Sequence, residues 1–539
     1  MLLKSLLVTI LSLSVAVEAA ALNKPELRQT IERAMRRCGV PGMAVAVLHK
    51  NELVFAEGFG KRNKKDPYTV ETVQPIGSVT KAMTATAIGE LVAEGKVDWD
   101  TTPVTKYLPE FKFKDPILTS QLTFVDLLSH RTGMPNVMIN WHIGESRRDL
   151  IKRLRYMDGI PRKLGVTAQY NNIMYAVAGE AAAKVAGTSY EDLVLNKVIR
   201  PLGLKNTGFS QPTMRKLHPD NYAMPHEALS YEQAEKGEFK TIPLEETYLT
   251  YAPAGDAYSN VLDLTRWGKV VMELGKVDGK QVLNDTAIEE TLKAHTIMYN
   301  GRRGPANGAA LTYGMGWMQD SYKGAVFYRH DGALSGYTSD LIVYPDHDLV
   351  IASVSNIVGI YQIANYLPKI ISETLLDLPK DSSSNIDWIE EIAVPQVKAY
   401  YAATAELAQG FLPPKVPNKP ATFANNLRAY AGEYSDPQFG TVTIGLETQS
   451  TNSSTGAKEV LTFKYSVFNS TLEHYHYDAF VATLENPMVR TKALITFSAD
   501  PVSGREKEDK KKRPIARMQI QELPLAMGIS DKVFKRRRV

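Results

Sequence analysis

Ser78 and Lys81 have the residue types and the spacing of a nucleophile and its proton acceptor. They open residues 78–94, where apolar and polar positions alternate at helical spacing and Gly95 is placed to end the helix. Residues three apart share a helix face, so the hydroxyl and the amine can meet, and N–H groups at a helix start point toward a developing oxyanion. The same pair could be a capping serine and a surface lysine, so other motifs must decide.

Two further motifs follow in the chain, Tyr170-Asn171-Asn172 and His330-Asp331-Gly332. Each is weak alone, because a tyrosine can be a core aromatic and a histidine before glycine is usually a loop residue. Taken in order with residues 78–81, they resemble the signature of the serine β-lactamase and penicillin-binding-protein superfamily, in which Ser-x-x-Lys, Tyr-x-Asn and Lys-Thr-Gly line one cleft. The class C branch is the most similar, because its second motif begins with tyrosine.

The resemblance covers roughly residues 26–378, and several segments look like structural landmarks of the family. These segments are residues 127–135 (LLSHRTGMP), 201–204 (PLGL), 208–210 (GFS) and 313–317 (YGMGW). The C-terminal part, with residues 430–434 (YAGEY) and 472–478 (LEHYHYD), resembles the lipocalin-like barrel appended to some family peptidases.

The resemblance implies a division of roles in the cleft. Ser78 would attack a carbonyl and form an acyl-enzyme, while Lys81 and Tyr170 share the proton transfers in a division that the sequence does not reveal. The backbone N–H groups of Ser78 and Ala333 would form the oxyanion hole. No cofactor and no metal are expected.

The same resemblance assigns substrate binding to Asn172 and to the strand around His330, Asp331 and Gly332. The third motif departs from the family pattern, since histidine stands for lysine and aspartate for threonine or serine. Histidine at this place resembles the esterase and D-aminopeptidase branches, and a site with His330 and Asp331 should accept free carboxylates poorly. Alternatively, Asp331 points away from the cleft and caps the following turn.

Composition excludes several classes of protein. The chain has 539 residues, 44% hydrophobic and 23% charged, which is typical of a globular protein of two or three domains. A net charge of +4 offers no footprint for nucleic acid. Lys4, the apolar run 6–17 and the small residues 19–21 predict a signal peptide over residues 1–21 and a secreted chain with no membrane segment after cleavage.

Export bears on two kinds of covalent modification. Cys38 is the only cysteine, which excludes an intramolecular disulfide and favours a small buried hydrophobe. Three Asn-x-Ser/Thr sequons, at Asn284, Asn452 and Asn469, indicate N-glycosylation if the chain passes through a eukaryotic secretory pathway.

The pattern of elements predicts an α+β fold. The elements expected are a helix over 23–37, a hairpin over 43–48 and 53–59, a helical lobe over 123–274, a strand over 324–329, a second hairpin within 340–355 and a closing helix over 360–378. Together they predict a class C β-lactamase-like catalytic domain over 22–380, with an antiparallel sheet flanked by helices. Residues 381–426 are a linker with a helical segment and a proline-rich stretch. Short β-rich pieces predict a small antiparallel barrel over 427–539.

The combined interpretation is a secreted serine hydrolase that cleaves a small ester or amide through a Ser78 acyl-enzyme, with a D-amino-acid-containing peptide as one candidate substrate. An acyltransferase or peptide cyclase of secondary metabolism is the alternative with the same intermediate. A non-catalytic scaffold or binding protein of the same fold is the alternative from another class. The presence of Ser78, Lys81, Tyr170 and Asn172 together argues against it.

Overall fold

The structure is a computed structural model. It describes residues 22–134, 146–157, 168–243, 249–299, 311–357, 366–376, 378, 386–410, 412, 419–450, 457–486, 489–500, 514–521 and 533–537. The expected signal peptide, over residues 1–21, lies outside the described residues, as do parts of the expected linker. Among the described residues, no helix is both long and apolar enough to cross a bilayer.

An eight-stranded antiparallel sheet forms the centre of the catalytic part, and it is assembled from both ends of that part. The strand order is β10-β11-β12-β13-β14-β15-β1-β2, so β1 pairs with β15 from some 300 residues further along. Hairpins β1–β2 and β14–β15 confirm the two predicted from sequence. The strands are β1 (Gly42–His49), β2 (Glu52–Gly60), β10 (Thr296–Tyr299), β11 (Leu311–Tyr313), β12 (Met318–Tyr322), β13 (Ala325–Leu334), β14 (Tyr337–Tyr344) and β15 (Leu349–Ser355).

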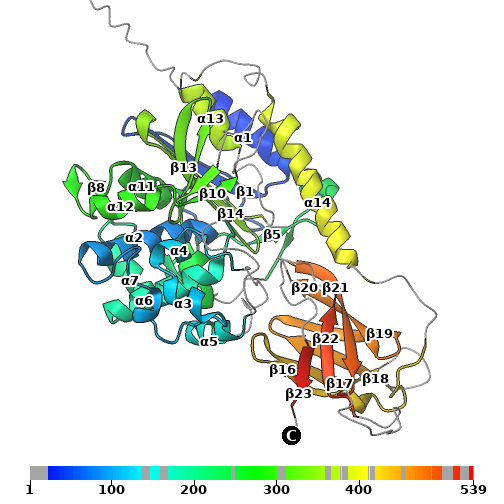
Figure 1. The fold of residues 1–539 in the computed structure, drawn as a ribbon. Helices are drawn as coiled ribbons and strands as arrows, with labels where there is room; N and C mark the ends of the chain where they lie inside the picture. Colours follow the sequence, from blue (N-terminus) through cyan, green and yellow to red (C-terminus); the bar gives the residue numbers. More distant parts are fainter. Residues whose placement is uncertain are drawn as a thin grey trace, which may run out of the picture.

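A helical lobe covers one face of this sheet (Figure 1), and α11 packs directly on β1, β14 and β15. Helix α2 is buried on nearly all sides, which matches its mostly apolar and small residues. The lobe consists of α2 (Thr80–Ala93), α3 (Pro116–Gln121), α4 (Phe124–Leu128), α5 (Arg147–Arg153), α6 (Asn172–Ala186), α7 (Tyr190–Val194), α8 (Gln211–Leu217), α10 (Ala252–Gly255), α11 (Val261–Met272) and α12 (Asp285–Leu292), with the short helical turns η1 (Gly77–Val79), η4 (Leu154–Tyr156) and η6 (Leu249–Tyr251).

A second hydrophobic cluster fills the space between the opposite face of the sheet and a group of helices that includes both ends of the catalytic part. Trp388, Val397 and Tyr401 lie in this cluster, so the helical segment of the expected linker packs on the catalytic part. Cys38 is buried there too, as expected. The helices are α1 (Lys24–Cys38), α9 (Tyr231–Lys236), α13 (Leu367–Leu375), η10 (Trp388–Ala393) and α14 (Val394–Gln409).

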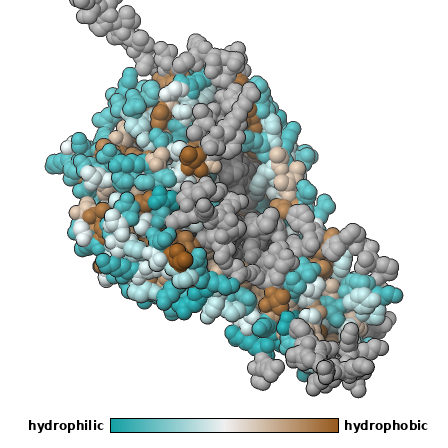
Figure 2. Space-filling view, in the orientation of Figure 1, coloured by the Kyte–Doolittle hydropathy of each residue, from teal (hydrophilic) through white to brown (hydrophobic). Residues whose placement is uncertain are grey.

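The C-terminal strands close into an eight-stranded antiparallel barrel, which confirms the predicted architecture. Its interior is filled by side chains that include Tyr434, Phe463 and Phe497. Figure 1 shows the barrel below the catalytic part, approached by α14. The strands are β16 (Gly432–Asp436), β17 (Gly440–Ser450), β18 (Ala457–Tyr465), β19 (Phe468–His476), β20 (Ala479–Asn486), β21 (Val489–Ser498), β22 (Arg517–Gln521) and β23 (Val533–Arg536). The face in Figure 2 is mostly hydrophilic, with apolar residues scattered over it.

Candidate active site

Ser78 and Lys81 meet where η1 passes into α2. Ser78 is half-buried and Lys81 is fully buried, with 0% of its surface exposed. The Lys81 Nζ lies 2.9 Å from Ser78 Oγ, 2.6 Å from Asn172 Oδ1 and 2.7 Å from the Ala254 carbonyl oxygen. The spacing of three in the sequence therefore places the amine on the hydroxyl, and two other oxygens fix its position.

Burial lowers the pKa of Lys81 well below its ordinary value, although the charge of Asp331 opposes the shift. A neutral amine has two N–H groups and one lone pair. The Asn172 and Ala254 oxygens can only accept, whereas the Ser78 hydroxyl can donate. In the neutral form the lone pair therefore faces Ser78, and Lys81 is placed to take the hydroxyl proton.

Tyr170 and Asn172 are positioned by the start of α6. Asn171 caps this helix, because its side chain accepts from the backbone N–H groups of Ile173 and Met174. Asn172 then begins the helix and reaches Lys81, while the Tyr170 ring centre lies 4.7 Å from Lys81 Nζ. The second predicted motif thus joins the first around one buried amine.

Two glycines allow β13 to approach Ser78 at main-chain distance. A Cβ on Gly332 would lie 1.9 Å from the Ile76 carbonyl oxygen, and a Cβ on Gly77, whose φ is +54°, would lie 2.7 Å from the Ala333 nitrogen. Ser78 and Ala333 both line the resulting cleft. Their N–H groups are the two predicted oxyanion donors. At position 77 no residue larger than glycine would let β13 come this close to Ser78.

His330 is buried beside the cleft and is not exposed on the cleft surface. It is 1% exposed, its Nδ1 lies 2.6 Å from the Asp331 carbonyl oxygen, and its Nε2 lies 2.9 Å from the Tyr313 hydroxyl. Nδ1 therefore carries the proton and Nε2 accepts from Tyr313. Burial lowers the pKa of His330 to about 4, although Asp331 opposes the shift, so the ring is neutral at pH 7.

The side chain of Asp331 points away from the cleft in which it was predicted to bind substrate. The predicted strand ends with the motif, but β13 continues to Leu334, and successive side chains alternate between the two faces. His330 and Gly332 face the lobe, and Asp331 faces the opposite side, where its carboxylate accepts a hydrogen bond from Arg329 at 3.3 Å. The alternative weighed from sequence, in which Asp331 points away from the cleft, fits this geometry.

Four residues of the site were missed as functional residues by the sequence analysis. His130 accepts the Asn171 N–H on Nδ1 and packs against Tyr170, with the ring centres 4.2 Å apart and the rings tilted by 41°. Tyr313 contacts His330, the Ala254 carbonyl holds Lys81, and Tyr251 lines the cleft. His130 and Tyr313 lie in the segments identified as family landmarks, which was the available signal.

The two described glycosylation sequons lie away from the cleft. Asn469 is exposed on β19, and Asn284 caps α12 by accepting from the Ala287 N–H. Asn452 lies outside the described residues. Within the described part of the chain, no cluster of three or more His, Cys, Asp or Glu side chains could hold a metal ion.

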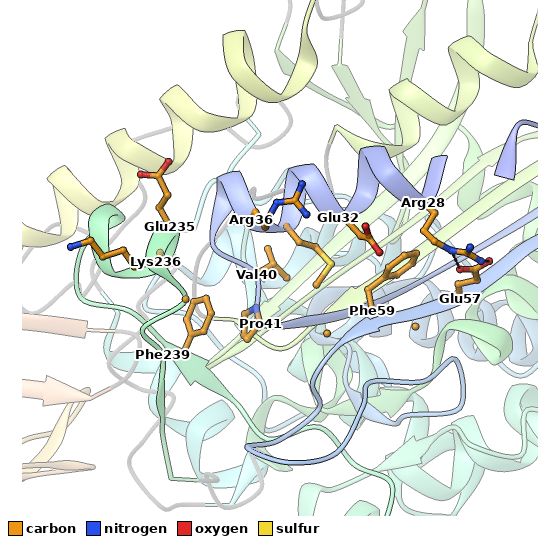
Figure 3. Close-up of a pocket in the computed structure, with 15 residues that line it drawn as sticks. Arg28, Glu32, Arg36, Val40, Pro41, Glu57, Phe59, Glu235, Lys236 and Phe239 are labelled. Carbon is orange, nitrogen blue, oxygen red and sulfur yellow. Dashed lines mark hydrogen bonds and ion pairs between the residues drawn. The ribbon is translucent and has the colours of Figure 1, made fainter. Parts of the chain in front are cut away.

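A larger cavity than the one beside Ser78 lies elsewhere in the molecule (Figure 3). It measures about 580 Å³ and is lined by residues of α1, β2 and α9 and the loop after α9. Its floor includes Phe59 and Phe239, and its rim includes the ion pair between Arg28 and Glu57. It contains no serine, threonine, cysteine or histidine, so its size does not mark it as the catalytic centre.

Comparison with family models identifies both parts of the chain. The model described as "Beta-lactamase" matches residues 27–375, about two thirds of the chain, and confirms the resemblance found from the three motifs. The model described as "Domain of unknown function (DUF3471)" matches residues 416–508, within the C-terminal part.

Among curated proteins, the chain is similar to two eukaryotic relatives. "Unguisins hydrolase ungD'" of Aspergillus campestris is 26% identical over 439 residues, which cover 78% of this chain and 77% of the relative. "Beta-lactamase-like protein 2" of Dictyostelium discoideum is 25% identical over 288 residues, which cover 51% of this chain and 50% of the relative.

Two solved structures share the fold. The octameric penicillin-binding protein homologue from Pyrococcus abyssi has a TM-score of 0.56 at 20% identity, covering 95% of this chain and 100% of that one. A D-stereospecific amidohydrolase from Streptomyces has a TM-score of 0.51 at 21% identity, covering 66% of this chain and 100% of that one. At these identities the likeness establishes the fold alone.

Proposed function

The chain belongs to the β-lactamase family and is a serine hydrolase, and from that premise we propose that it cleaves a small, uncharged ester or amide through an acyl-enzyme on Ser78. One observation carries the proposal: the fully buried Lys81 amine lies between two oxygens that only accept and the one hydroxyl that can donate. Such an amine is a general base held against a nucleophile.

The proposed reaction has two stages. Lys81 takes the Ser78 proton as Oγ attacks the carbonyl carbon, and the N–H groups of Ser78 and Ala333 hold the oxyanion. The proton then passes to the leaving alcohol or amine, with Tyr170 beside Lys81 as the second proton-transfer group. In the second stage water attacks the ester, Lys81 or Tyr170 takes its proton, and Ser78 regains its own.

The substrate class follows from the charges at the cleft. The described residues that line it are Gly77, Ser78, Asn172, Tyr251, Ala254, Gly255, Ala333 and Leu334, none of which is charged. His330 is neutral, and Asp331 faces away, so neither charge attraction nor charge repulsion selects an ionic substrate. We therefore propose neutral esters and amides as preferred substrates, over carboxylate-bearing β-lactams.

We favour a peptide, cleaved at an amide bond, as the natural substrate. The relative from Aspergillus campestris is named for the hydrolysis of unguisins, and its alignment covers most of this chain. A D-amino-acid-containing peptide fits the proposed neutral cleft because the cleft offers no cation for a terminal carboxylate. Transfer of the acyl group to an amine or alcohol would use the same acyl-enzyme.

Intact-mass analysis after treatment with a fluorophosphonate tests the nucleophile. We expect one adduct per chain, mapped to Ser78, and no adduct on Ser78→Ala. Ser120→Ala is the matched control, since this exposed serine only bonds the Ile117 carbonyl at the end of α3. Wild-type labelling of Ser78→Ala would refute the mechanism.

Product analysis separates hydrolysis from transfer. Purified enzyme is given a neutral p-nitrophenyl ester and a D-alanine p-nitroanilide, with and without a competing amine. Free acid as the main product with the amine present supports the hydrolase, and an amide product in excess of free acid supports an acyltransferase instead.

We also propose that the chain is exported and glycosylated. The charge, apolar run and small residues at positions 4–21 support cleavage of a signal peptide, and the exposed Asn469 is the most accessible acceptor among the described sequons. After expression in a secreting eukaryotic host, the culture medium should contain protein whose N-terminus lies near Leu22. Retention of residues 1–21 in the mature protein would refute cleavage of a signal peptide. A mass that a glycosidase does not change would refute glycosylation.

A further inference from the structure

Tyr251 connects the catalytic lysine to the cleft wall. It ends η6 and directly precedes α10, whose Ala254 carbonyl accepts a hydrogen bond from Lys81. Tyr251 is 3% exposed and lines the cleft beside Ser78 and Asn172. The tyrosine therefore stands on the same short segment that fixes the general base.

The cleft beside Ser78 is small. Its cavity measures about 20 Å³, which is room for about one water molecule. Half of its eight lining residues are glycines and alanines, and only Tyr251 and Leu334 contribute large apolar side chains. Leu334 is half-buried, whereas Tyr251 is buried. The buried ring is thus the part of the wall that cannot turn into solvent to admit a longer group.

Tyr251 is connected to the barrel through a continuous hydrophobic cluster. Tyr251 belongs to the same hydrophobic cluster as Leu154 and Met157 of the lobe and Phe439 and Tyr465 of the barrel. Tyr465 is 2% exposed, and its hydroxyl donates to the Phe439 carbonyl at 2.7 Å. Burial raises the pKa of Tyr251, and Tyr465 adds to the shift. Helix α5, which ends at Arg153, contacts the turn η6 that ends at Tyr251.

Two other contacts fix the barrel on the catalytic part. The Arg153 guanidinium lies so close to Gly440 that a Cβ there would be 2.7 Å from its Nη1. Arg490 of β21 pairs with the buried carboxylate of Glu227, which is on the catalytic part. The end of the barrel that holds Tyr465 is therefore set against the lobe and is not free to drift from it.

We propose that Tyr251 determines the length of the acyl group that the enzyme accepts, and that Tyr465 of the barrel is a positioning residue that holds Tyr251 in this place. The acyl group is then short and apolar, because it meets a buried ring with a packed domain behind it. The inference rests on the proposed acyl-enzyme at Ser78. It gives the C-terminal barrel a role in specificity without any contact of its own with the substrate.

A series of p-nitrophenyl esters from acetate to decanoate tests the wall. We expect wild type to prefer the short esters, and Tyr251→Ala to raise the ratio of octanoate to acetate kcat/KM by about tenfold or more, since removing the ring opens the apolar wall. Tyr465→Ala should change the same ratio in the same direction by about threefold. Tyr477→Ala, an exposed barrel tyrosine, is the matched control and should leave the ratio unchanged.

Fluorophosphonate labelling of Ser78 in the same samples separates failures. An unchanged ester ratio in Tyr251→Ala that still labels Ser78 would overturn the specificity role. A changed ratio there with an unchanged ratio in Tyr465→Ala would overturn the role of the barrel. Tyr465→Leu, which keeps an apolar side chain, replaces the alanine variant if that one does not fold. Absence of labelling and of ester hydrolysis in wild type would instead refute the proposed function.

Discussion

The two faces of β13 carry different kinds of polar group. On the lobe face, the neutral His330 and Gly332 lie close to a single buried amine, that of Lys81, which is held by three oxygens. On the other face, Arg329 pairs with Asp331, and Asp340 lies opposite Asp331 in the register of β14. One face therefore holds an amine ready for proton transfer, and the other holds opposite charges beside one another.

This difference indicates which residues of the third motif take part in chemistry. A buried, hydrogen-bonded amine with no carboxylate in contact can lose its proton, because burial disfavours its charge more than the charge of Asp331 stabilises it. A guanidinium beside carboxylates stays charged and contributes to the packing of the sheet. Adjacent residues of one motif thus have separate roles, and substitutions on the two faces should affect different measurements.

Lys81→Ala should have the largest effect on this comparison. Removing the general base should lower kcat by about 10³-fold with a smaller change in KM, since the amine acts on the Ser78 proton. Steady-state kinetics with a neutral ester measure this. Lys369→Ala, which removes a buried lysine on the opposite face, is the control. An equally large loss of kcat in that variant would show that removing any buried lysine inactivates the enzyme.

Replacement of His330 tests whether residues on the lobe face of β13 alone determine the preference for neutral or anionic substrates. His330→Lys should raise the kcat/KM for benzylpenicillin relative to a neutral ester by about tenfold, because it adds a cation on the lobe face of the strand. The double variant with Asp331→Thr should match the single variant within about twofold, since Asp331 faces away. A large additional gain in the double variant would place Asp331 in the cleft after all.

Asp331→Asn should change stability more than catalysis. Loss of the charge that faces Arg329 should lower the free energy of unfolding by about 1–3 kcal/mol, while kcat/KM for a neutral ester should change by less than about threefold. Denaturant unfolding and ester kinetics on one preparation measure both. A hundredfold loss of activity without loss of stability would contradict the assignment to the opposite face.

Asp340→Asn should give the smallest effect, and one that depends on pH. Burial raises the pKa of Asp340 from 3.8 to about 7, although Arg329 opposes the shift, and the carboxyl is 1% exposed. The folded state binds this proton more tightly than the unfolded state, so its contribution to stability is complete below pH 3.8 and is lost as pH rises through 7.

The variant lacks this loss, so its melting temperature relative to wild type should rise by a few degrees between pH 4 and pH 8. Asp346→Asn, in the exposed turn between β14 and β15, is the control and should show no such trend. A melting difference between Asp340→Asn and wild type that is constant with pH would contradict a raised pKa.

Much of the fold could be predicted from local patterns. The hairpins β1–β2 and β14–β15, the helix after Ser78 and the change to short strands near residue 430 follow from periodicity and turn residues. Ser78 and Lys81 meet because a separation of three residues places both on one side of a helical turn. Information of this kind lies within one element, so the sequence alone determined it.

Contacts between distant elements were decided only by the tertiary structure. The Ala254 carbonyl reaches Lys81 across 173 positions of sequence, and a barrel residue, Tyr465, shares one hydrophobic cluster with the cleft residue Tyr251. Asp331 shows the same limit within one strand, because side chains alternate and the end of β13 fixes which face each residue occupies. Packing between elements, which no local pattern specifies, selects the residues that face the cleft.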